Sequence, residues 1–349
     1  KAASSCSTNL VIDSDVCRAT VTDLQIVHQV IFAFSDGIMG CMTSATDRQA
    51  LKQMMESLGT YARKISFANE LDASEQAHVR ATLTKYHEEP SYVCTMDIKK
   101  GKTASKFVFV VGKNRLFLMR KKPKVVPGAS LVKEEAHILT LLEIRLWGPR
   151  GITLVFRNFE IEGETENPDE VVACIRRAFL ASFSHFPREI MFKVTATPPA
   201  VVPPDEDMVG MVRREESACG GFVNTYQALC SYYGTPVSEN LCWDIKRLYA
   251  TNHVFDLKSL FPEEASDAEF VPALHALRYN THFSTFVNDT FKIKATATLN
   301  GISALLKCNT TLTTLSLPGS GLSDKVMLNL FEAILSNPAC RIVNFDLSV

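Results

Sequence analysis

The 349-residue sequence lacks the motifs that mark most enzymes and metal proteins. Its ten cysteines include no Cys-x-x-Cys pair, and neither a Gly-x-Ser-x-Gly turn nor a His-Glu-x-x-His helix occurs. The Gly-Lys-Thr at 101–103 has Met96 where a phosphate-binding loop has glycine. We therefore predict a protein that is not an enzyme and that binds no metal and no cofactor.

Long apolar runs and an excess of one charge are also missing. The longest apolar stretch near the start, Ile26 to Phe34, is interrupted by His28 and Gln29 and is far shorter than the roughly 20 residues that cross a bilayer. The net charge is −1, whereas nucleic-acid binders are strongly basic, so no nucleic-acid partner is expected. No signal-peptide pattern is present. We expect a cytoplasmic protein with reduced cysteines. Because the chain starts at Lys1 and ends in a strand-like run, we expect it to be part of a longer polypeptide.

Residues 1–66 have a helical pattern. In Asp47 to Leu58 the apolar residues recur every three or four positions, which places them on one helix face. This helix resembles the outgoing helix of a calmodulin-like hand. The preceding loop has Asp36 as its one carboxylate, whereas calcium takes about six to eight oxygen ligands. We predict a helical module that binds no calcium.

Residues 67–192 change to a strand pattern. After a short helix at Ser74 to Thr84, six short runs rich in β-branched and aromatic residues are separated by turn residues. One amphipathic helix follows, with Pro168 in its first turn. Six or seven strands and a closing helix are the order of a pleckstrin-homology fold, in which the helix plugs one end of a small bent barrel. The predicted fold class is therefore α+β, with several domains.

The window from Ile98 to Lys124 is strongly basic and free of acidic residues, while the stretch 125–172 that follows it is acidic. The basic residues of this window are Lys99, Lys100, Lys102, Lys106, Lys113, Arg115, Arg120, Lys121, Lys122 and Lys124. The net charge is close to zero, but the basic and acidic residues of this domain are segregated into separate stretches.

The strand pattern distributes these basic residues over three turns. Residues 99–106 fall at the first hairpin turn, 113–115 at the second turn on the opposite end, and 121–124 before the third loop on the first side. In pleckstrin-homology domains the first and third loops flank the inositol-phosphate pocket. Anionic headgroups attract each basic residue by roughly 1 kcal/mol, which favours binding through a diffuse basic face. The alternative is ordinary solvated hairpin turns.

Residues 193–207 are rich in proline and are predicted to be a semi-stiff linker that leaves its neighbours independent. A helical linker or cap is expected at 208–290. Leucine-rich repeats are expected at 291–349, because the spacing Leu312-x-x-Leu315-x-Leu317 recurs one repeat length further on as Ile342-x-x-Phe345-x-Leu347. Phe283-x-x-Phe286 is a weaker match to the same spacing, one repeat length before the first match. Ser320 stands where such repeats usually have asparagine.

The segment that begins at Cys219-Gly220-Gly221-Phe222 is the most specific in the chain. It continues with Tyr226, Cys230, Gly234, Trp243-Asp244, Tyr249, the run Leu257 to Phe261, Pro272 through Leu277, Tyr279-Asn280 and Phe283. These residues, together with the domain order, resemble the CARMIL family over about residues 67–349. The family has a pleckstrin-homology domain, a helical segment and ribonuclease-inhibitor-like repeats. Residues 1–66 have no counterpart in the resemblance.

The residues that carry the resemblance are expected to be structural. Gly220 and Gly221 permit a tight turn, while Phe222, Tyr226, Trp243 and Tyr249 supply large anchors between domains. Tyr279 and Phe283 are expected to cap the open end of the first repeat. Trp243→Ala should then cost about 3 to 5 kcal/mol, with the pleckstrin-homology domain unaffected.

The resemblance implies a scaffold at the interface between the membrane cortex and the actin cytoskeleton. Its partners would be actin-capping or other cytoskeletal proteins and an anionic membrane surface, with a homodimer formed through regions outside these residues. The family's capping-protein and myosin segments lie beyond the repeats and are not found here. The alternative is a structural component of a stable cortical or flagellar assembly with no lipid role.

Overall fold

The computed structural model describes residues 66–67, 71–100, 103–121, 132–203, 218–289 and 291–348. The predicted helical module at 1–66 and its calcium-free loop lie outside these residues, except for Ser66. The chain divides into two compact units, 1–66 and 67–349. The elements from Ser66 onward are, in chain order, β1 (Ser66–Phe67), α3 (Ala73–Thr84), β2 (Tyr92–Lys100), β3 (Thr103–Val111), β4 (Arg115–Arg120), β5 (Val132–His137), η2 (Ile138–Thr140), β6 (Leu141–Trp147), β7 (Gly151–Phe156), β8 (Glu160–Glu164), α4 (Pro168–Ser182), η3 (Arg188–Ile190), β9 (Lys193–Thr197), η4 (Ala218–Gly221), α6 (Phe222–Tyr233), α7 (Glu239–Leu248), β10 (Val254–Asp256), α8 (Leu257–Leu260), α9 (Asp267–Leu277), β11 (Thr285–Val287), α10 (Thr296–Cys308), β12 (Thr314–Ser316), α11 (Asp324–Leu335) and β13 (Asn344–Asp346).

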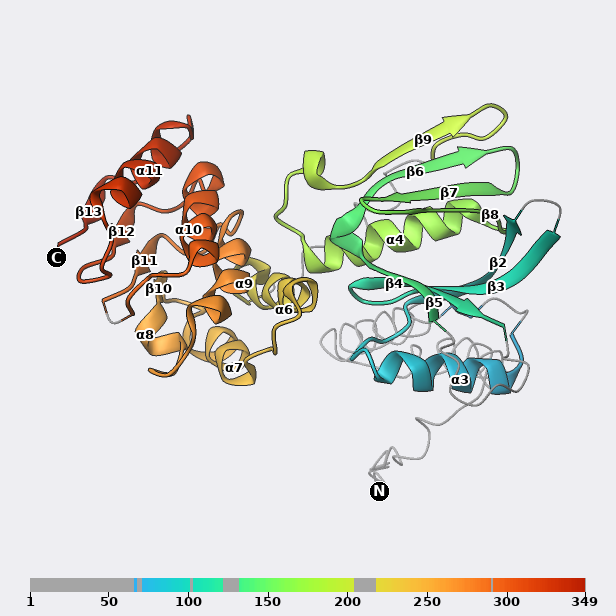
Figure 1. The fold of residues 1–349 in the computed structure, drawn as a ribbon, viewed down its shortest axis with the longest axis horizontal. Coiled ribbons are helices and arrows are strands. Elements are labelled where there is room, and N and C mark those ends of the chain that lie inside the picture. Colours follow the sequence, from blue (N-terminus) through green and yellow to red (C-terminus); the bar gives the residue numbers. More distant parts are fainter. Residues whose placement is uncertain are drawn as a thin grey trace, which may run out of the picture. The chain divides into compact units, whose positions relative to one another are not determined.

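A large sheet dominates residues 71–203, hereafter the sheet region. Its strand order is β5-β4-β3-β2-β8-β7-β6-β9, and every pair is antiparallel except β6 with β9. Strands β2–β5 and β6–β9 form two layers, with α4 between them (Figure 1). The buried face of α4, which includes Val171, Ile175 and Phe179, fills the space between the layers. The chain is thus of the α+β class that the sequence pattern predicts.

Helix α3 covers the outer face of β2, β3 and β4. Val79 and Leu83 of the helix pack against Val108, Val110 and Phe117 in a second core, separate from the main one. A capping box between Asp72 and Glu75 fixes the helix start. The outer face of these strands is therefore apolar and buried, so α3 is part of the folded sheet region.

The stretch that composition marks as a linker begins with a strand. Lys193–Thr197 pairs in parallel with β6, where Val194 lies opposite Ile144. The strand forms because this part alternates valine, threonine and alanine ahead of the prolines, so its backbone N–H groups remain available for pairing. The linker prediction is therefore wrong for 193–197, and residues 204–207 lie outside the described part.

Four short parallel strands, in the order β10-β11-β12-β13, form a second sheet, hereafter the periodic sheet. Phe255, Phe286, Leu315 and Phe345 stand in register at the same position of each strand. Helices α9, α10 and α11 alternate with the strands along the chain. The periodic sheet therefore starts at Val254, two strands before the predicted boundary at residue 291. The weaker match Phe283-x-x-Phe286 indicates the second strand, β11. No apolar residue stands three positions before Phe255, so the sequence pattern does not indicate β10.

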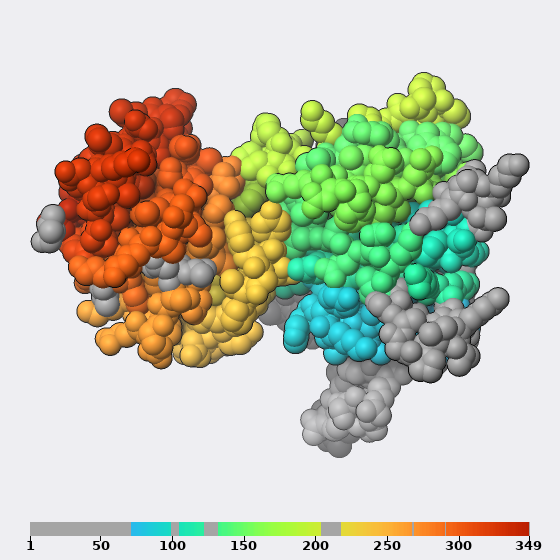
Figure 2. Space-filling model, viewed as in Figure 1, coloured from blue at the N-terminus to red at the C-terminus, as the bar shows by residue number. Residues whose placement is uncertain are grey.

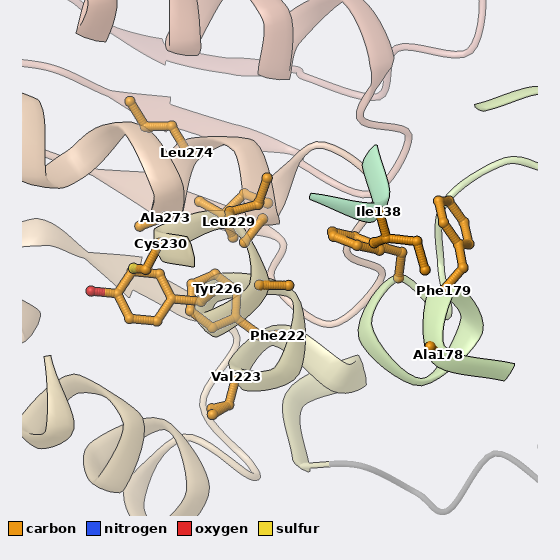
Figure 3. Close-up of a cluster of buried hydrophobic side chains, with 14 of the residues drawn as sticks. Ile138, Ala178, Phe179, Phe222, Val223, Tyr226, Leu229, Cys230, Ala273 and Leu274 are labelled. Carbon is orange, nitrogen blue, oxygen red and sulfur yellow. The ribbon is translucent and has the colours of Figure 1, made fainter. Parts of the chain in front are cut away.

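One hydrophobic core runs from the sheet region through α6 into the periodic sheet. Figure 3 shows Phe222, Tyr226 and Leu229 of α6 on one side and Ile138 and Phe179 on the other. On the face shown in Figure 2, the yellow atoms of α6 touch the green atoms of the sheet region. The prediction that the proline-rich stretch makes these regions independent is wrong, because apolar surface from both sides is buried in common.

Candidate functional site

The basic residues fall at two ends of the sheet region. Lys99 and Lys100 end β2 beside the first hairpin turn, where Lys100 lies opposite Thr103. The exposed Arg120 lies opposite Phe107, next to the exposed Lys106, so these residues share that end. Lys102, Lys122 and Lys124 lie outside the described residues. This group, 99–106 with Arg120 and Lys121, is the basic tip.

Lys121 is not a free cation at the basic tip. Its Nζ lies 3.7 Å from the Glu75 carboxylate of α3, and its side chain is 30% exposed. An ion pair of this exposure contributes little to stability, about 0 to 1 kcal/mol. It does lower the local positive potential, so Lys121 adds less to the charge of the tip than an unpaired lysine would.

Lys113 and Arg115 lie at the opposite end and contact α6. Lys113 Nζ donates to Gln227 Oε1 (3.1 Å), and Arg115 Nε donates to Ser231 Oγ (3.0 Å). A second Arg115 nitrogen donates to the Ser231 carbonyl oxygen at 2.6 Å, and the guanidinium also pairs with Glu135. These two basic residues therefore hold protein groups, which departs from their predicted place on a solvated lipid-binding face.

The contact between the sheet region and α6, hereafter the α6 joint, contains several buried polar groups. His137 Nε2 lies 3.0 Å from the Ala228 carbonyl oxygen, while its Nδ1 accepts the Leu139 N–H. The His137 ring therefore donates through Nε2. Burial and the nearby Arg115 charge lower the pKa of His137 to about 3, so the ring is neutral at physiological pH.

The predicted anchors of the cap are mostly buried. Gly220 and Gly221 adopt positive φ angles of 62° and 74°, which turn the chain into α6. Phe222, Tyr226 and Phe283 are all at most 2% exposed, and Tyr249 is 7% exposed. Tyr279 contacts Phe186 of the sheet region, with ring centroids 4.8 Å apart. Phe222 thus packs α6 against Phe255 and Phe283, while Tyr279 contacts the sheet region directly.

Trp243 is the exception, because its side chain is 57% exposed. The buried face of α7 is formed by Leu241, Cys242 and Ile245. Two positions along a helix correspond to a rotation of about 200°, so Trp243 lies opposite Leu241. The prediction that Trp243 is a buried anchor is wrong.

Trp243→Ala is accordingly expected to change the free energy of unfolding by no more than about 0.5 kcal/mol, the range of ordinary surface substitutions. Urea denaturation followed by circular dichroism measures this change. A loss of about 3 kcal/mol would instead mean that the indole is packed.

A ladder of buried asparagines joins successive turns of the periodic region. Asn309 Nδ2 donates to the carbonyl oxygens of Leu277 (2.7 Å) and Asn280 (3.2 Å). Asn337 Nδ2 makes the same pair of bonds to Leu306 (2.9 Å) and Asn309 (2.8 Å). Sequence reasoning looked for asparagine at Ser320 and missed this ladder, although Asn280, Asn309 and Asn337 recur at almost equal spacing.

The described residues contain no cluster suited to binding a metal ion. No group of three or more His, Cys, Asp or Glu side chains among them is placed to hold a metal ion. A cleft of about 650 Å³ at the start of α4 is lined by Glu166, Asp169, Glu170 and three prolines, without histidine, cysteine, serine or lysine. In the part of the chain that is described, no helix combines the length and hydropathy needed to cross a bilayer.

No protein-family model matches the chain. Protein CARMIL from Dictyostelium discoideum is 28% identical over 291 residues, which cover 80% of this chain and 26% of that protein. Human capping protein, Arp2/3 and myosin-I linker protein 3 is 29% identical over 134 residues, which cover 38% of this chain and 10% of that protein. The chain thus spans about a quarter or less of the length of these relatives.

Solved structures give weaker likenesses. The linker-DH/PH domains of p115-RhoGEF match 38% of this chain and 42% of that chain at 13% identity, with a TM-score of 0.23, which is too low to establish a common fold. The match to the Dictyostelium protein covers most of the chain, and the names of both relatives agree with the resemblance seen in the segment from Cys219 onward. The chain is therefore a relative of the CARMIL proteins.

Proposed function

We propose that the chain is part of a non-enzymatic cytoplasmic scaffold that links a membrane surface to the actin cytoskeleton and regulates filament assembly as CARMIL-like proteins do. The observation that carries this proposal is the 28% identity to Dictyostelium CARMIL over 291 residues. The human relative is named as a linker of capping protein, Arp2/3 and myosin-I, so proteins of these kinds are the proposed partners.

We further propose that residues 67–192 form a pleckstrin-homology-like barrel and that the periodic sheet begins a leucine-rich repeat solenoid. Strands β2 to β8, which all pair antiparallel and are followed by α4, support the first assignment. The in-register parallel strands, which recur at nearly equal intervals along the chain and are joined by helices, support the second. The boundary at residue 207 is part of this proposal, whereas the strands at Lys193–Thr197 and Val254–Asp256 replace the boundaries first expected at 192 and 290.

The proposed membrane contact is the basic tip. Changing Lys99, Lys100, Lys102 and Lys106 together to Glu should weaken binding to phosphatidylserine vesicles by more than about tenfold, because each basic residue near an anionic surface contributes roughly 1 kcal/mol. Co-sedimentation at low and at physiological salt measures the effect, since screening reduces it.

The matched control carries the same charge change on four exposed lysines elsewhere: Lys246, Lys258, Lys307 and Lys325. If the parent does not bind at low salt, or if both variants bind equally, the basic tip is not a membrane contact. The second candidate function, a protein-binding component without a lipid role, would then hold. The pairing of Lys113, Arg115 and Lys121 with protein groups favours that alternative.

A further inference from the structure

The α6 joint contains a chain of buried polar groups that starts at a carboxyl group. Both oxygens of Glu88 accept the Asn114 backbone N–H (3.2 and 3.0 Å). Asn114 Oδ1 accepts a hydrogen bond from Ser182 Oγ (2.9 Å), and the Ser182 carbonyl oxygen accepts one from Thr225 Oγ1 of α6 (2.8 Å). All four residues are buried. Glu88 is thus connected to α6 through the β3–β4 turn and the end of α4.

The same turn carries the two cations that hold α6. Lys113 and Arg115 flank Asn114, and their side chains donate to Gln227 and Ser231. Glu88 therefore fixes the backbone of a turn whose side chains bind α6. The space around its carboxyl group is tight, since a Cβ added at Gly112 would lie 2.6 Å from Glu88 Oε2. A change of charge at Glu88 acts directly on this turn.

We propose that the α6 joint is proton-linked: uptake of a proton by Glu88 stabilises the docked position of α6, and loss of that proton promotes its release. When α6 is docked, Lys113 donates to Gln227, and Arg115 donates to Ser231 and pairs with Glu135. The Glu88 carboxyl group stays buried in this state. Release of α6 lets both cations turn towards the carboxylate and admits water to the turn, and both effects favour the ionised form.

The titration range of Glu88 makes this linkage relevant near neutral pH. Burial raises the pKa of Glu88 to about 7, against the opposing effects of the Asn114 and Lys113 N–H groups and of the Arg115 and Lys113 charges. Because the pKa of Glu88 is raised in the docked state, its contribution to the stability of docking is complete below pH 4.5. This contribution decreases as the pH rises from 4.5 towards about 7.

Other titratable groups border Glu88 and the joint. His137, at the end of β5, has a lowered pKa, so its contribution has the opposite sign and is lost as the pH falls below 6.5. Glu135 is paired with Arg115, and the adjacent His87 and Glu89 are exposed. The two contributions offset each other between pH 4.5 and 6.5, so the parent should dock best over a broad range around pH 5.5, with an acid limb from His137 and an alkaline limb from Glu88.

Hydrogen exchange of the α6 amides at pH 6 and pH 8, corrected for intrinsic rates, tests the proposal on the whole chain. The variant Glu88→Gln keeps the size and the acceptor oxygen but cannot titrate. The ratio of α6 opening in the parent to that in Glu88→Gln should rise by up to about tenfold from pH 6 to pH 8, the value for complete return of the pKa to 4.5 on opening.

Two comparisons make the outcome decisive. Glu89→Gln, an exposed neighbour, should leave the pH dependence of the parent unchanged. The same ratio measured at amides of β3, such as that of Val108, should change less between pH 6 and pH 8 than it does at the amides of α6. An equal ratio at pH 6 and pH 8 would overturn the proposal, and so would a change of the same size at Val108, because Glu88 would then act on the sheet rather than on the joint.

Discussion

Replacing Phe222 with alanine is expected to lower the free energy of unfolding by about 3 to 5 kcal/mol, as for other fully buried aromatic side chains. The ring is 0% exposed and stands where α6 meets the periodic sheet. Its centroid lies 5.2 Å from that of Phe255 and 5.7 Å from that of Phe283, with Tyr226 stacked at 6.0 Å. Truncation leaves a cavity that these rigid rings cannot close.

The loss from Phe222→Ala should reach the sheet region, because one core connects it to α6. Urea denaturation measured by near-ultraviolet dichroism gives the total loss, and hydrogen exchange gives its location. Trp243→Ala is the matched control, an aromatic truncation on the neighbouring helix where the side chain is exposed. If Phe222→Ala costs less than about 1 kcal/mol, or if amides of β6 and β7 keep full protection, α6 does not connect the two regions.

The local elements of this chain follow from its sequence because their causes are local. Alternating β-branched residues predict β3, and Pro168 followed by Asp169 and Glu170 predicts the start of α4 at the observed residue. The recurrence of Leu315 and Phe345 predicts β12 and β13. Each of these signals lies within one element or one repeat.

The α6 joint has no such local cause. Arg115 and Ser231 are 116 residues apart, and neither has a pattern that distinguishes it from a solvated turn or helix residue. The sequence therefore predicts a diffuse lipid-binding face spread over three turns, although Lys113 and Arg115 in the middle of the window bind α6. The same limit explains Trp243: the residue type suggests an anchor, whereas the burial of Leu241 and Ile245 decides which face of α7 is packed.

Truncating Asn309 is expected to be as costly as truncating Phe222, for a different reason. Its amide donates to the carbonyl oxygens of Leu277 and Asn280, and its Oδ1 accepts the N–H groups of Thr311 (2.8 Å) and Leu312 (2.7 Å). Asn309→Ala leaves these four groups without that partner in a site where Asn309 is 5% exposed. The Leu277 carbonyl oxygen still accepts the Asn280 N–H (3.1 Å), but each buried group that loses its partner costs about 1 to 3 kcal/mol. Even with relaxation we therefore expect a loss of about 3 to 5 kcal/mol.

The spacing of the ladder determines where the loss from Asn309→Ala should appear. Asn337 donates to the Asn309 carbonyl oxygen, so the damage should spread towards α11 and β13. Hydrogen exchange should show lost protection at Thr311 and Leu312 and around Phe331. The control is Asn344→Ala, an exposed asparagine whose Nδ2 makes one bond, to Thr314 Oγ1 at 3.3 Å, and which should cost less than about 0.5 kcal/mol. Equal losses in the free energy of unfolding for the two variants would show that Asn309 contributes no more than a surface residue does. The periodic sheet would then be stabilised by the packing of its in-register apolar residues alone.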